Sequence, residues 1–249
     1  MTRGTALVTG SARRIGRSLA LCAAECGYDV AIHHRDAAAD AKALADEIVA
    51  LGRRAALVRG DLADPDIGRL IGEATAALGP VTLLVNNASL FEDDRIATLT
   101  AASLEAHLGP NLRAPILLTQ AFAAALPKGA KGLVVNLVDQ RVTHPNPQFF
   151  SYTLSKTALW TATTMAAQAL APDIRVNAIG PGPTLPSIHQ SVEDFAAEAA
   201  AIPLETGATP ADIAQALRYL IDACAVTGQM IAVDGGQHLA WRTPDIIGA

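Results

Sequence analysis

The stretch that decides the fold is TALVTGSARRIG, at residues 5–16. Its first five residues form a short apolar run that predicts a buried strand, and residues 16–25 predict a helix. Gly10 permits a sharp turn between the two, and Gly16 lets the helix pack close to the sheet. The helix N-terminus then offers free N–H groups and the positive end of its dipole to a pyrophosphate. The middle glycine of the G-x-G-x-x-G fingerprint is absent, so a turn shaped only for packing is the alternative.

The same alternation of strand and helix continues along the chain. Further strands are expected at residues 29–33, 54–58, 81–86, 131–137, 174–179 and 230–233. Further helices are expected at residues 40–51, 112–125, 152–169 and 209–221, and one more that begins with Asp64 as N-cap and Pro65 at its first position. Repeated β–α alternation predicts parallel pairing with right-handed crossovers. We therefore expect one α/β domain over residues 1–249, with a Rossmann-like, doubly wound parallel seven-stranded sheet and helices on both faces.

Residues 180–207 break this alternation. They hold Pro181, Pro183, Pro186 and Pro203 around one short helical piece at 192–201. A long connection after a strand end is usually functional or mobile. We interpret residues from about 183 to 207 as a substrate lid.

Composition and charge exclude several classes of protein. The chain of 249 residues is 51% hydrophobic and 17% charged, which is too apolar for a disordered chain. A net charge of −5, with both signs interspersed, argues against a nucleic-acid or membrane-surface partner. No apolar run reaches the roughly 18 to 20 residues that a membrane span needs, and the N-terminus lacks the pattern of a signal peptide. We expect a soluble, cytoplasmic protein.

The cysteines are Cys22, Cys26 and Cys224, an odd number in a large chain. Cys22 and Cys26 share one face of the expected helix, which leaves a metal site as an alternative. We expect them instead to be small, buried, reduced hydrophobes, and we predict no metal site.

Polar residues at successive strand ends predict a dinucleotide site. The second strand ends in His33, His34 and Arg35, where a carboxylate would otherwise bind the adenosine ribose, and Arg13 approaches from the first turn. Cations at this point favour a 2′-phosphate and hence NADP(H). Asp36 keeps NAD(H) open as the alternative. Short polar segments that begin with Asp61-Leu62 and with Asn86-Asn87-Ala88-Ser89 follow the third and fourth strands, at the edge where α/β sheets bind ligands.

A second group of residues forms a proton-handling pattern. Tyr152 and Lys156 are four residues apart and so lie on one face of a helix. Asp139 stands thirteen residues before the tyrosine, at the end of an apolar run. An acid, a phenol and an ammonium around one strand end are suited to moving a proton. A Tyr-x-x-x-Lys spacing alone also arises by chance.

The chain resembles the short-chain dehydrogenase/reductase family over nearly its whole length. The resemblance rests on TGSARRIG at 9–16, Asp61, NNAS at 86–89, Asn111, Tyr152-x-x-x-Lys156, Pro181-Gly182 and VDGG at 233–236. It implies that Tyr152 is the catalytic acid/base, that Lys156 binds the nicotinamide ribose and lowers the tyrosine pKa, and that Asn111 holds a water linking the lysine to solvent. It also implies a homotetramer. The NADP(H)-binding residues that follow are Gly10, Arg13, Arg14, Ile15, Gly16, His34, Arg35, Asp61, Leu62, Asn87, Ala88, Ser89, Tyr152, Lys156, Pro181 and Gly182.

Asp139 departs from the family pattern. Most members place a serine about there, whereas Val138, Asp139 and Gln140 offer no hydroxyl. A carboxylate beside a ketone that becomes an alkoxide is repulsive unless it is protonated. Beside an N–H-bearing heterocycle it accepts hydrogen bonds and relays a proton. A degenerate enzyme that has lost its serine is the alternative.

An Asp-Tyr-Lys site resembles the pteridine reductases and the dihydromonapterin-reductase-like members of the family. In that branch Phe91 would stack on the pterin and Arg14 would reach both the cofactor phosphate and the pterin. The implied substrate-binding residues are Arg14, Ser89, Phe91, Asp139 and Tyr152. The predicted reaction is therefore NADPH-dependent reduction of a pterin C=N bond, with Asp139, Tyr152, Lys156 and Asn111 as the catalytic residues. Three alternatives stay open: Phe91 packs under the lid, the chain is an NADPH-dependent carbonyl or imine reductase, or it is a non-catalytic NADPH-sensing module.

Overall fold

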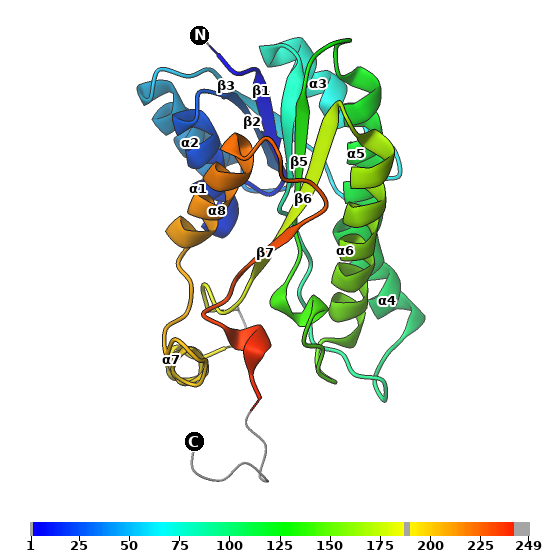
Figure 1. Ribbon diagram of the computed structural model, residues 1–249, viewed down its shortest axis with the longest axis vertical. Helices are drawn as coiled ribbons and strands as arrows, with labels where there is room; N and C mark the ends of the chain where they lie inside the picture. Colours follow the sequence, from blue (N-terminus) through cyan, green and yellow to red (C-terminus); the bar gives the residue numbers. More distant parts are fainter. Residues whose placement is uncertain (1, 187–189, 242–249) are drawn as a thin grey trace.

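The computed structural model describes residues 2–186 and 190–241, and Figure 1 labels its elements. The strands are β1 (Thr5–Val8), β2 (Asp29–His34), β3 (Ala55–Arg59), β4 (Val81–Asn86), β5 (Gly132–Leu137), β6 (Ile174–Pro181) and β7 (Met230–Val233). The α-helices are α1 (Arg14–Glu25), α2 (Ala38–Ala50), α3 (Arg69–Leu78), α4 (Ala101–Leu108), α5 (Ala114–Ala125), α6 (Phe150–Leu170), α7 (Val192–Ala200) and α8 (Pro210–Asp222).

The seven strands form one parallel sheet in the order β3-β2-β1-β4-β5-β6-β7, which confirms the predicted doubly wound fold. The order reverses between β1 and β4, because the chain crosses from the edge strand β3 back to the middle of the sheet. Ligands of open α/β sheets bind outside the carboxyl ends of the strands at such a switch point. In Figure 1 these ends point down, toward α7.

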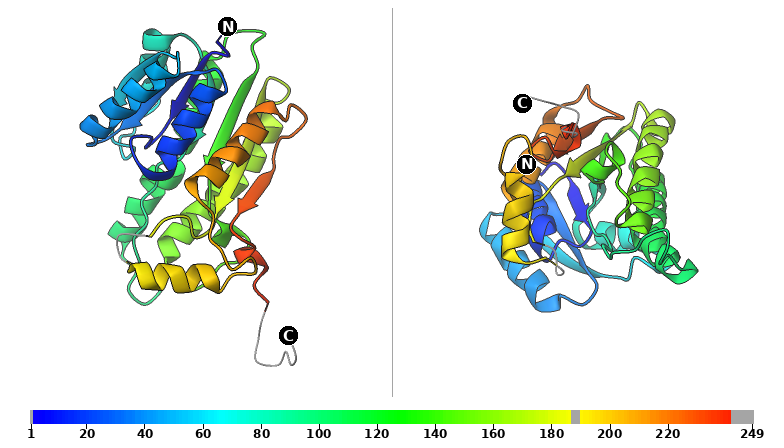
Figure 2. Two further views of the ribbon diagram at one scale, coloured as in Figure 1. Left: turned by 90° about the vertical axis from the view of Figure 1, so that its left-hand side faces the viewer. Right: turned by 90° about the horizontal axis from the view of Figure 1, so that it is seen from below.

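Helices cover both faces of the sheet, and each face has its own apolar core (Figures 1 and 2). One core lies under α1, α2 and α8 and is built around Leu19, Leu44 and Leu217. The other lies under α3, α5 and α6 and includes Leu70 and Phe122. The central strands β1, β4 and β5 are buried on both faces, as their continuous apolar runs require.

The connection from β3 to α3 differs from the prediction. Asp64 does not cap a helix: its side chain accepts a hydrogen bond from the Asp66 N–H at 2.9 Å, which closes a local turn. The chain makes further turns, and α3 begins only at Arg69. The prediction of a helix start at Asp64 was wrong because an Asp-Pro pair is favourable both at a helix N-cap and in a turn.

Two further differences concern α4 and the cysteines. Helix α4 was not predicted, although Thr100 and Ser103 cap its first turn reciprocally. Cys22 is buried, as expected, whereas Cys224 is exposed. Within the described residues, no helix is long and apolar enough to cross a membrane, and no group of three or more His, Cys, Asp or Glu side chains is arranged to hold a metal ion.

Candidate active site

Two adjoining cavities open at the carboxyl ends of the strands. One has a volume of about 500 Å³ and is lined by Asp139, Tyr152 and Lys156, among others. The second has a volume of about 600 Å³ and is lined by Gly10, Arg35 and Asp61, among others. Ser89 lines both cavities. All residues that the sequence predicted to bind cofactor or substrate line one of them, except Gly16, while Asn111 lies outside both.

The loop between β1 and α1 makes the sharp turn that the sequence predicted. Gly10 has a φ of +61°, in the left-handed region that favours glycine. A Cβ on Gly16 would lie 2.3 Å from the Gly10 carbonyl oxygen, so the close approach needs a glycine there. Arg14 stands near the missing middle glycine and itself has a φ of +54°, which strains a residue with a side chain. The amide group of Asn87 holds the loop through the carbonyls of Thr9, at 2.8 Å, and Gly10, at 3.2 Å.

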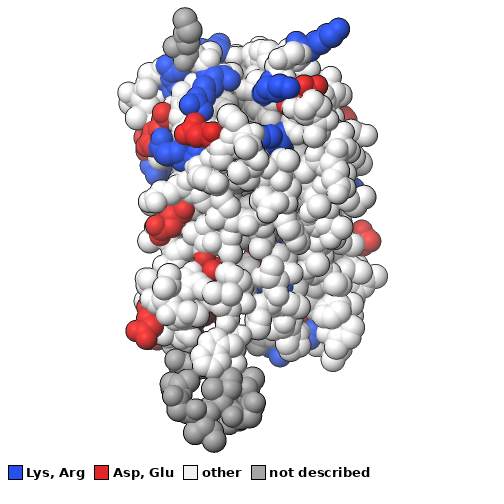
Figure 3. Space-filling model, in the orientation of Figure 1, with Lys and Arg blue, Asp and Glu red and all other residues white. Residues whose placement is uncertain are grey.

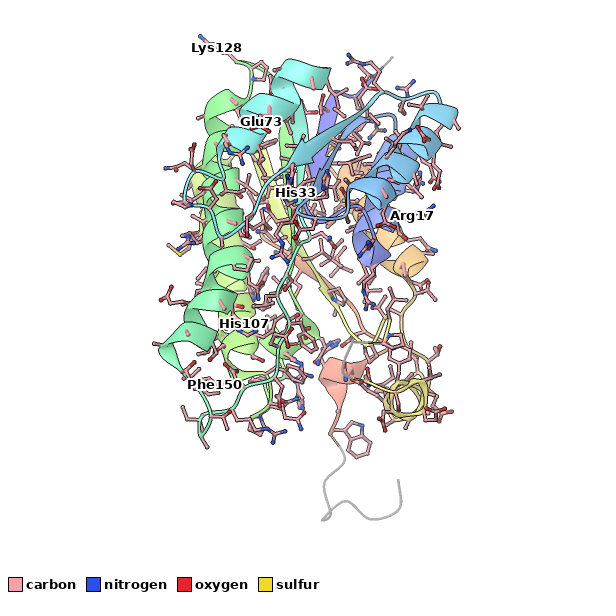
Figure 4. The ribbon with its side chains drawn as sticks, turned by 180° about the vertical axis from the view of Figure 1, so that it is seen from behind. Arg17, His33, Glu73, His107, Lys128 and Phe150 are labelled. Carbon is pink, nitrogen blue, oxygen red and sulfur yellow. The ribbon has the colours of Figure 1, made fainter. Side chains whose placement is uncertain are left out.

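His33 stabilises the same loop, a role that sequence reasoning missed. Its Nδ1 accepts the Gly10 N–H at 3.0 Å, and its Nε2 lies 3.1 Å from the Gly60 carbonyl oxygen. Because that oxygen only accepts, Nε2 carries the proton and the ring is neutral. Burial lowers the pKa of His33 to about 4, which keeps it neutral. Figure 4 labels it near the middle of the molecule, at the carboxyl end of β2. The feature that identifies this role is the burial of His33 between two glycine-bearing turns, and burial cannot be seen in the sequence alone.

The second cavity has the features that a phosphorylated nucleotide needs. Helix α1 begins without an acidic residue or a side-chain cap, so its first N–H groups are available to an anion. Arg13 donates to Asp40 at 2.7 Å, and Arg35 donates to Asp36 at 2.8 Å. Both guanidinium groups are largely exposed and can bind a phosphate. Asp36 therefore pairs with Arg35 and also lines the cavity beside it.

His34 adds an unsatisfied polar atom to this cavity. It is buried, and its Nδ1 has no hydrogen-bond partner among the described residues. A buried nitrogen without a partner is costly, and a ligand hydroxyl or phosphate oxygen would satisfy it. The residues present therefore fit an adenosine with a 2′-phosphate.

At the other end, Asp139 connects the strand end of β5 to the helix α6. The Tyr152 hydroxyl donates to Asp139 Oδ2 at 2.8 Å, and the Arg141 N–H donates to Oδ1 at 2.8 Å. Lys156 Nζ donates to the Leu137 carbonyl oxygen at 2.7 Å and lies 5.7 Å from the centre of the Tyr152 ring. The structure thus brings together the acid, the phenol and the ammonium that the sequence singled out.

Burial shifts all three ionisable groups toward their neutral forms. It raises the pKa of the Asp139 carboxyl, although hydrogen bonds from Arg141 and Tyr152 oppose the rise. Burial and the neighbouring Asp139 raise the pKa of Tyr152 well above its ordinary value. Burial lowers the pKa of Lys156 to about 8. In the protein chain by itself, burial and the adjacent Asp139 thus oppose phenolate formation, and the lowering of the tyrosine pKa by Lys156 stays a prediction.

Asn111 lies in a π-helical turn, Gly109–Arg113, and its side chain is fully engaged. Its Oδ1 accepts from the Leu90 N–H at 2.8 Å and from the Ser89 hydroxyl at 3.1 Å. Its amide donates to the Leu90 carbonyl at 2.9 Å and to Ser155 at 3.1 Å. The side chain thus connects the loop after β4 to α6 through hydrogen bonds. The water that would link Lys156 to solvent stays a prediction.

An aromatic cluster lines the cavity beside Tyr152. Phe91 stacks on Phe149 with ring centres 4.2 Å apart, and its ring meets Tyr152 edge-on at 4.7 Å. The Arg141 guanidinium lies 5.1 Å from the centre of the Phe149 ring. Phe149 has a φ of +51°, a strained conformation for a residue with a side chain. Sequence reasoning missed Arg141 and Phe149, although each lies within three residues of a predicted catalytic side chain.

The loop after Phe91 is fixed at three consecutive residues. The Glu92 N–H donates to His107 Nε2 at 3.2 Å, and Asp93 accepts the Phe149 N–H at 3.2 Å. Asp94 is buried and accepts the Ser151 N–H at 2.8 Å, which satisfies a free donor at the start of α6. Figure 4 labels His107 and Phe150 in this lower part of the molecule, near α4 and the start of α6. The loop thereby holds the Phe91 backbone against the helix that carries Tyr152.

Comparison with known proteins identifies the family. The family model described as enoyl-(acyl carrier protein) reductase matches residues 10–238. The 3-oxoacyl-(acyl-carrier-protein) reductase FabG of Staphylococcus aureus (strain Mu50) is 31% identical over 241 residues, which cover 94% of this chain and 98% of that protein. The chain belongs to the short-chain dehydrogenase/reductase family.

Similar solved structures indicate which cofactor the protein uses. The crystal structure of FolM alternative dihydrofolate reductase 1 from Brucella canis, complexed with NADP, has a TM-score of 0.95 and 48% identity, and covers 99% of this chain and 100% of that chain. A blue fluorescent protein from a metagenomic library, in complex with NADPH, has a TM-score of 0.88 and 32% identity, and covers 94% of this chain and 98% of that chain. The chain is thus an NADP-dependent oxidoreductase, in agreement with the cations around its second cavity.

Proposed function

We propose that this protein is an NADPH-dependent reductase of a pterin C=N bond, with a dihydrobiopterin-like or dihydromonapterin-like substrate. The observation that carries the proposal is the Asp139 carboxylate, 2.8 Å from the Tyr152 hydroxyl, where most family members place a serine. The 48% identity to a FolM alternative dihydrofolate reductase supports it, because dihydrofolate contains the same reduced pterin ring.

The chemistry of Asp139 favours a nitrogen heterocycle over a ketone. A ketone that accepts hydride becomes an alkoxide, and a nearby carboxylate repels that charge. A pterin instead presents ring N–H and amino groups, which a carboxylate accepts as short, strong hydrogen bonds. Asp139 therefore orients the substrate ring, and its partners Arg141 and Tyr152 keep the carboxylate in place.

Proton delivery falls to Tyr152. Hydride is the chemistry that the nicotinamide supplies when NADPH is bound. The raised pKa of Tyr152 keeps its phenol protonated, so the hydroxyl is ready to donate to the ring nitrogen. Lys156, with its pKa lowered to about 8, is poised to return a proton to the tyrosine or to the coupled Asp139.

Aromatic stacking and cofactor contacts complete the proposed site. Phe91 lines the cavity with Tyr152 and offers a flat surface for a pterin ring. Arg14 and Ser89 line the same cavity and would hydrogen-bond the cofactor and the pterin head group. We assign the phosphates to the α1 N-terminus and the 2′-phosphate to Arg13, His34 and Arg35.

The test is NADPH oxidation with dihydrobiopterin and dihydromonapterin, comparing the wild type with Asp139→Ser. We expect the variant to lose about 100-fold or more in kcat/KM on the pterins, and to gain on ketones relative to pterins. The control is Asp173→Ser, because Asp173 is exposed and pairs only with a surface lysine among the described residues. Wild-type protein that reduces ketones well and no pterin at all would refute the proposal.

The second candidate is an NADPH-dependent carbonyl or imine reductase of another small substrate. The 31% identity to FabG supports it, since that protein is named as a reductase of 3-oxoacyl groups. A screen of ketones and cyclic imines distinguishes it from the first candidate. Tight NADPH binding without turnover on pterins, ketones or imines would instead support a non-catalytic sensor.

The lid and the assembly stay predictions. Part of the proposed lid, residues 187–189, lies outside the described residues. For a homotetramer, support comes from apolar side chains exposed on α5 and α6, namely Ile116, Leu154 and Met165. Figure 3 shows that charged side chains gather toward the end of the molecule where the N-terminus lies and are sparse along the right-hand side, where Figure 1 places α5 and α6. Light scattering measures the assembly, and cell fractionation tests the cytoplasmic location.

A further inference from the structure

Helix α7 places a second carboxylate in the cavity that holds Asp139. Phe195 and Glu198 are three residues apart, so they lie on the same face of α7, and both line that cavity. Within α7, Phe195, Glu198 and Ala199 are partly buried and the other residues are exposed, so the helix contacts the rest of the protein through this face. Figure 2 (left) shows α7 lying across the end of the molecule beyond the strands.

The Glu198 carboxylate is held in place by neutral groups. Gln190 donates to Glu198 Oε2 at 2.8 Å, and Gln237 donates to Oε1 at 3.1 Å. The two amides come from opposite sides in the sequence, one before α7 and one after β7, and both line the cavity. Carboxamides orient a carboxylate without cancelling its charge, and each oxygen keeps a lone pair for another donor.

The cations of the cavity are engaged elsewhere. Arg14 donates to the carbonyls of Leu185, at 3.4 Å, and Pro186, at 2.9 Å. Arg141 lies over Phe149 and donates to Asn146 at 2.9 Å. Among the described residues, no lysine or arginine lies within ion-pair distance of Glu198. A ligand part that reaches α7 therefore meets a carboxylate that no lysine or arginine of the described residues pairs with.

We propose that Glu198 is a specificity-determining residue that selects substrates with neutral, hydroxyl-bearing tails and rejects substrates with anionic tails. The inference rests on the proposed pterin reduction, in which Asp139 binds the ring and leaves the tail to face α7. A tail hydroxyl donates a charge-assisted hydrogen bond to Glu198. A tail carboxylate placed beside it is repelled, and like charges in contact strongly disfavour binding.

The experiment compares two substrates that share a ring and differ in the tail. Dihydrobiopterin has a neutral dihydroxypropyl tail, and dihydrofolate has a glutamate tail with two carboxylates. We measure kcat/KM by NADPH oxidation for the wild type, Glu198→Gln and Glu198→Lys. The control is Glu193→Gln, which removes an exposed carboxylate from the first turn of the same helix.

The selectivity ratio, kcat/KM for dihydrobiopterin over that for dihydrofolate, should fall about tenfold in Glu198→Gln and further in Glu198→Lys. The change should appear mainly in KM for dihydrofolate, and it should shrink as salt is added. Glu193→Gln should leave the ratio at its wild-type value. An unchanged ratio in both Glu198 variants, with dihydrobiopterin still reduced, would overturn the inference and leave the proposed function standing. A wild type that reduces neither substrate would overturn both.

Discussion

The buried ammonium of Lys156 should destabilise the folded protein near neutral pH. Raising the pH should restore this stability, because the ammonium then loses its proton. The side chain is only 2% exposed, and burial lowers its pKa from the ordinary 10.5 to about 8. At about 1.36 kcal/mol for each pKa unit, this difference corresponds to about 3 kcal/mol of destabilisation near neutral pH. Replacing Lys156 with methionine removes the charge and keeps most of the side-chain volume.

The sign of the pH dependence follows from proton counting. Between about pH 8 and pH 10.5 the unfolded chain keeps the Lys156 proton and the folded protein has lost it. The unfolded state therefore binds more protons, and the free energy of unfolding rises with pH across this window. From the two pKa values, about 2 kcal/mol is recovered between pH 7 and pH 9.5. The lost hydrogen bond to the Leu137 carbonyl costs Lys156→Met about 1 kcal/mol at every pH.

Urea unfolding of the protein at intervals from about pH 7 to pH 9.5 measures this contribution. The difference between Lys156→Met and the wild type should move by about 2 kcal/mol across the series, in favour of the variant at pH 7. Lys42→Met is the control, because the Lys42 side chain is 71% exposed and pairs with Asp46 on the surface. Parallel profiles for the wild type and Lys156→Met would refute the reasoning, since the ammonium would then not be penalised by burial.

Three further predictions concern residues around the two cavities. Asp94→Asn should destabilise the protein by about 2 kcal/mol at neutral pH, because the hydrogen bonds of Ser151 and Ser103 to the carboxylate outweigh burial and hold the pKa of Asp94 below its ordinary value. This stabilisation is present above the unfolded pKa of about 3.9 and is lost as pH falls through the lower folded pKa. Thermal unfolding should therefore show that the difference in stability between the wild type and Asp94→Asn disappears in acid. Arg14→Gly should raise the free energy of unfolding by about 1 kcal/mol by relieving the positive φ, and should raise KM for NADPH; a less stable variant with unchanged KM would contradict it. Phe91→Leu should raise KM for the pterin up to about tenfold through lost stacking, with NADPH affinity, measured by fluorescence titration, unchanged; the reverse pattern would place Phe91 at the cofactor instead.

Local chemistry explains which elements the sequence predicts well. The run VTLLVN predicts β4 with its exact bounds, because a strand covered on both faces must be continuously apolar. Helix α4 lacks a clear apolar stripe, and His107 is its one fully buried residue, so periodicity does not reveal it. At Asp64 the same residue types serve a turn and a helix start, and only the surrounding structure decides between them.

Some residues of the candidate site can likewise be predicted from the sequence, and others cannot. Residues at strand ends, such as Asp139 and Asp61, follow from topology, because parallel strands bring their carboxyl ends to one edge. The roles of His33 and Glu198 depend on partners distant in the sequence, Gly60 and Gln237 respectively, which no local pattern identifies. The left-handed backbone of Phe149 was equally hidden, because nothing in that residue type favours a positive φ.

The pKa shifts of Asp139, Tyr152 and Lys156 favour chemistry that adds no net charge around these three residues. Burial raises the pKa of the carboxyl and of the Tyr152 phenol and lowers that of the Lys156 ammonium. Hydride transfer to either a ketone or an imine therefore requires a proton from the site in the same reaction, because a charged product would be unfavourable there. Here Tyr152 donates to Asp139, and the ammonium gives up its proton more readily than an ordinary lysine. What favours a nitrogen heterocycle over a ketone is the Asp139 carboxylate, because it can accept the N–H and amino groups of a pterin ring and a ketone offers no such donor.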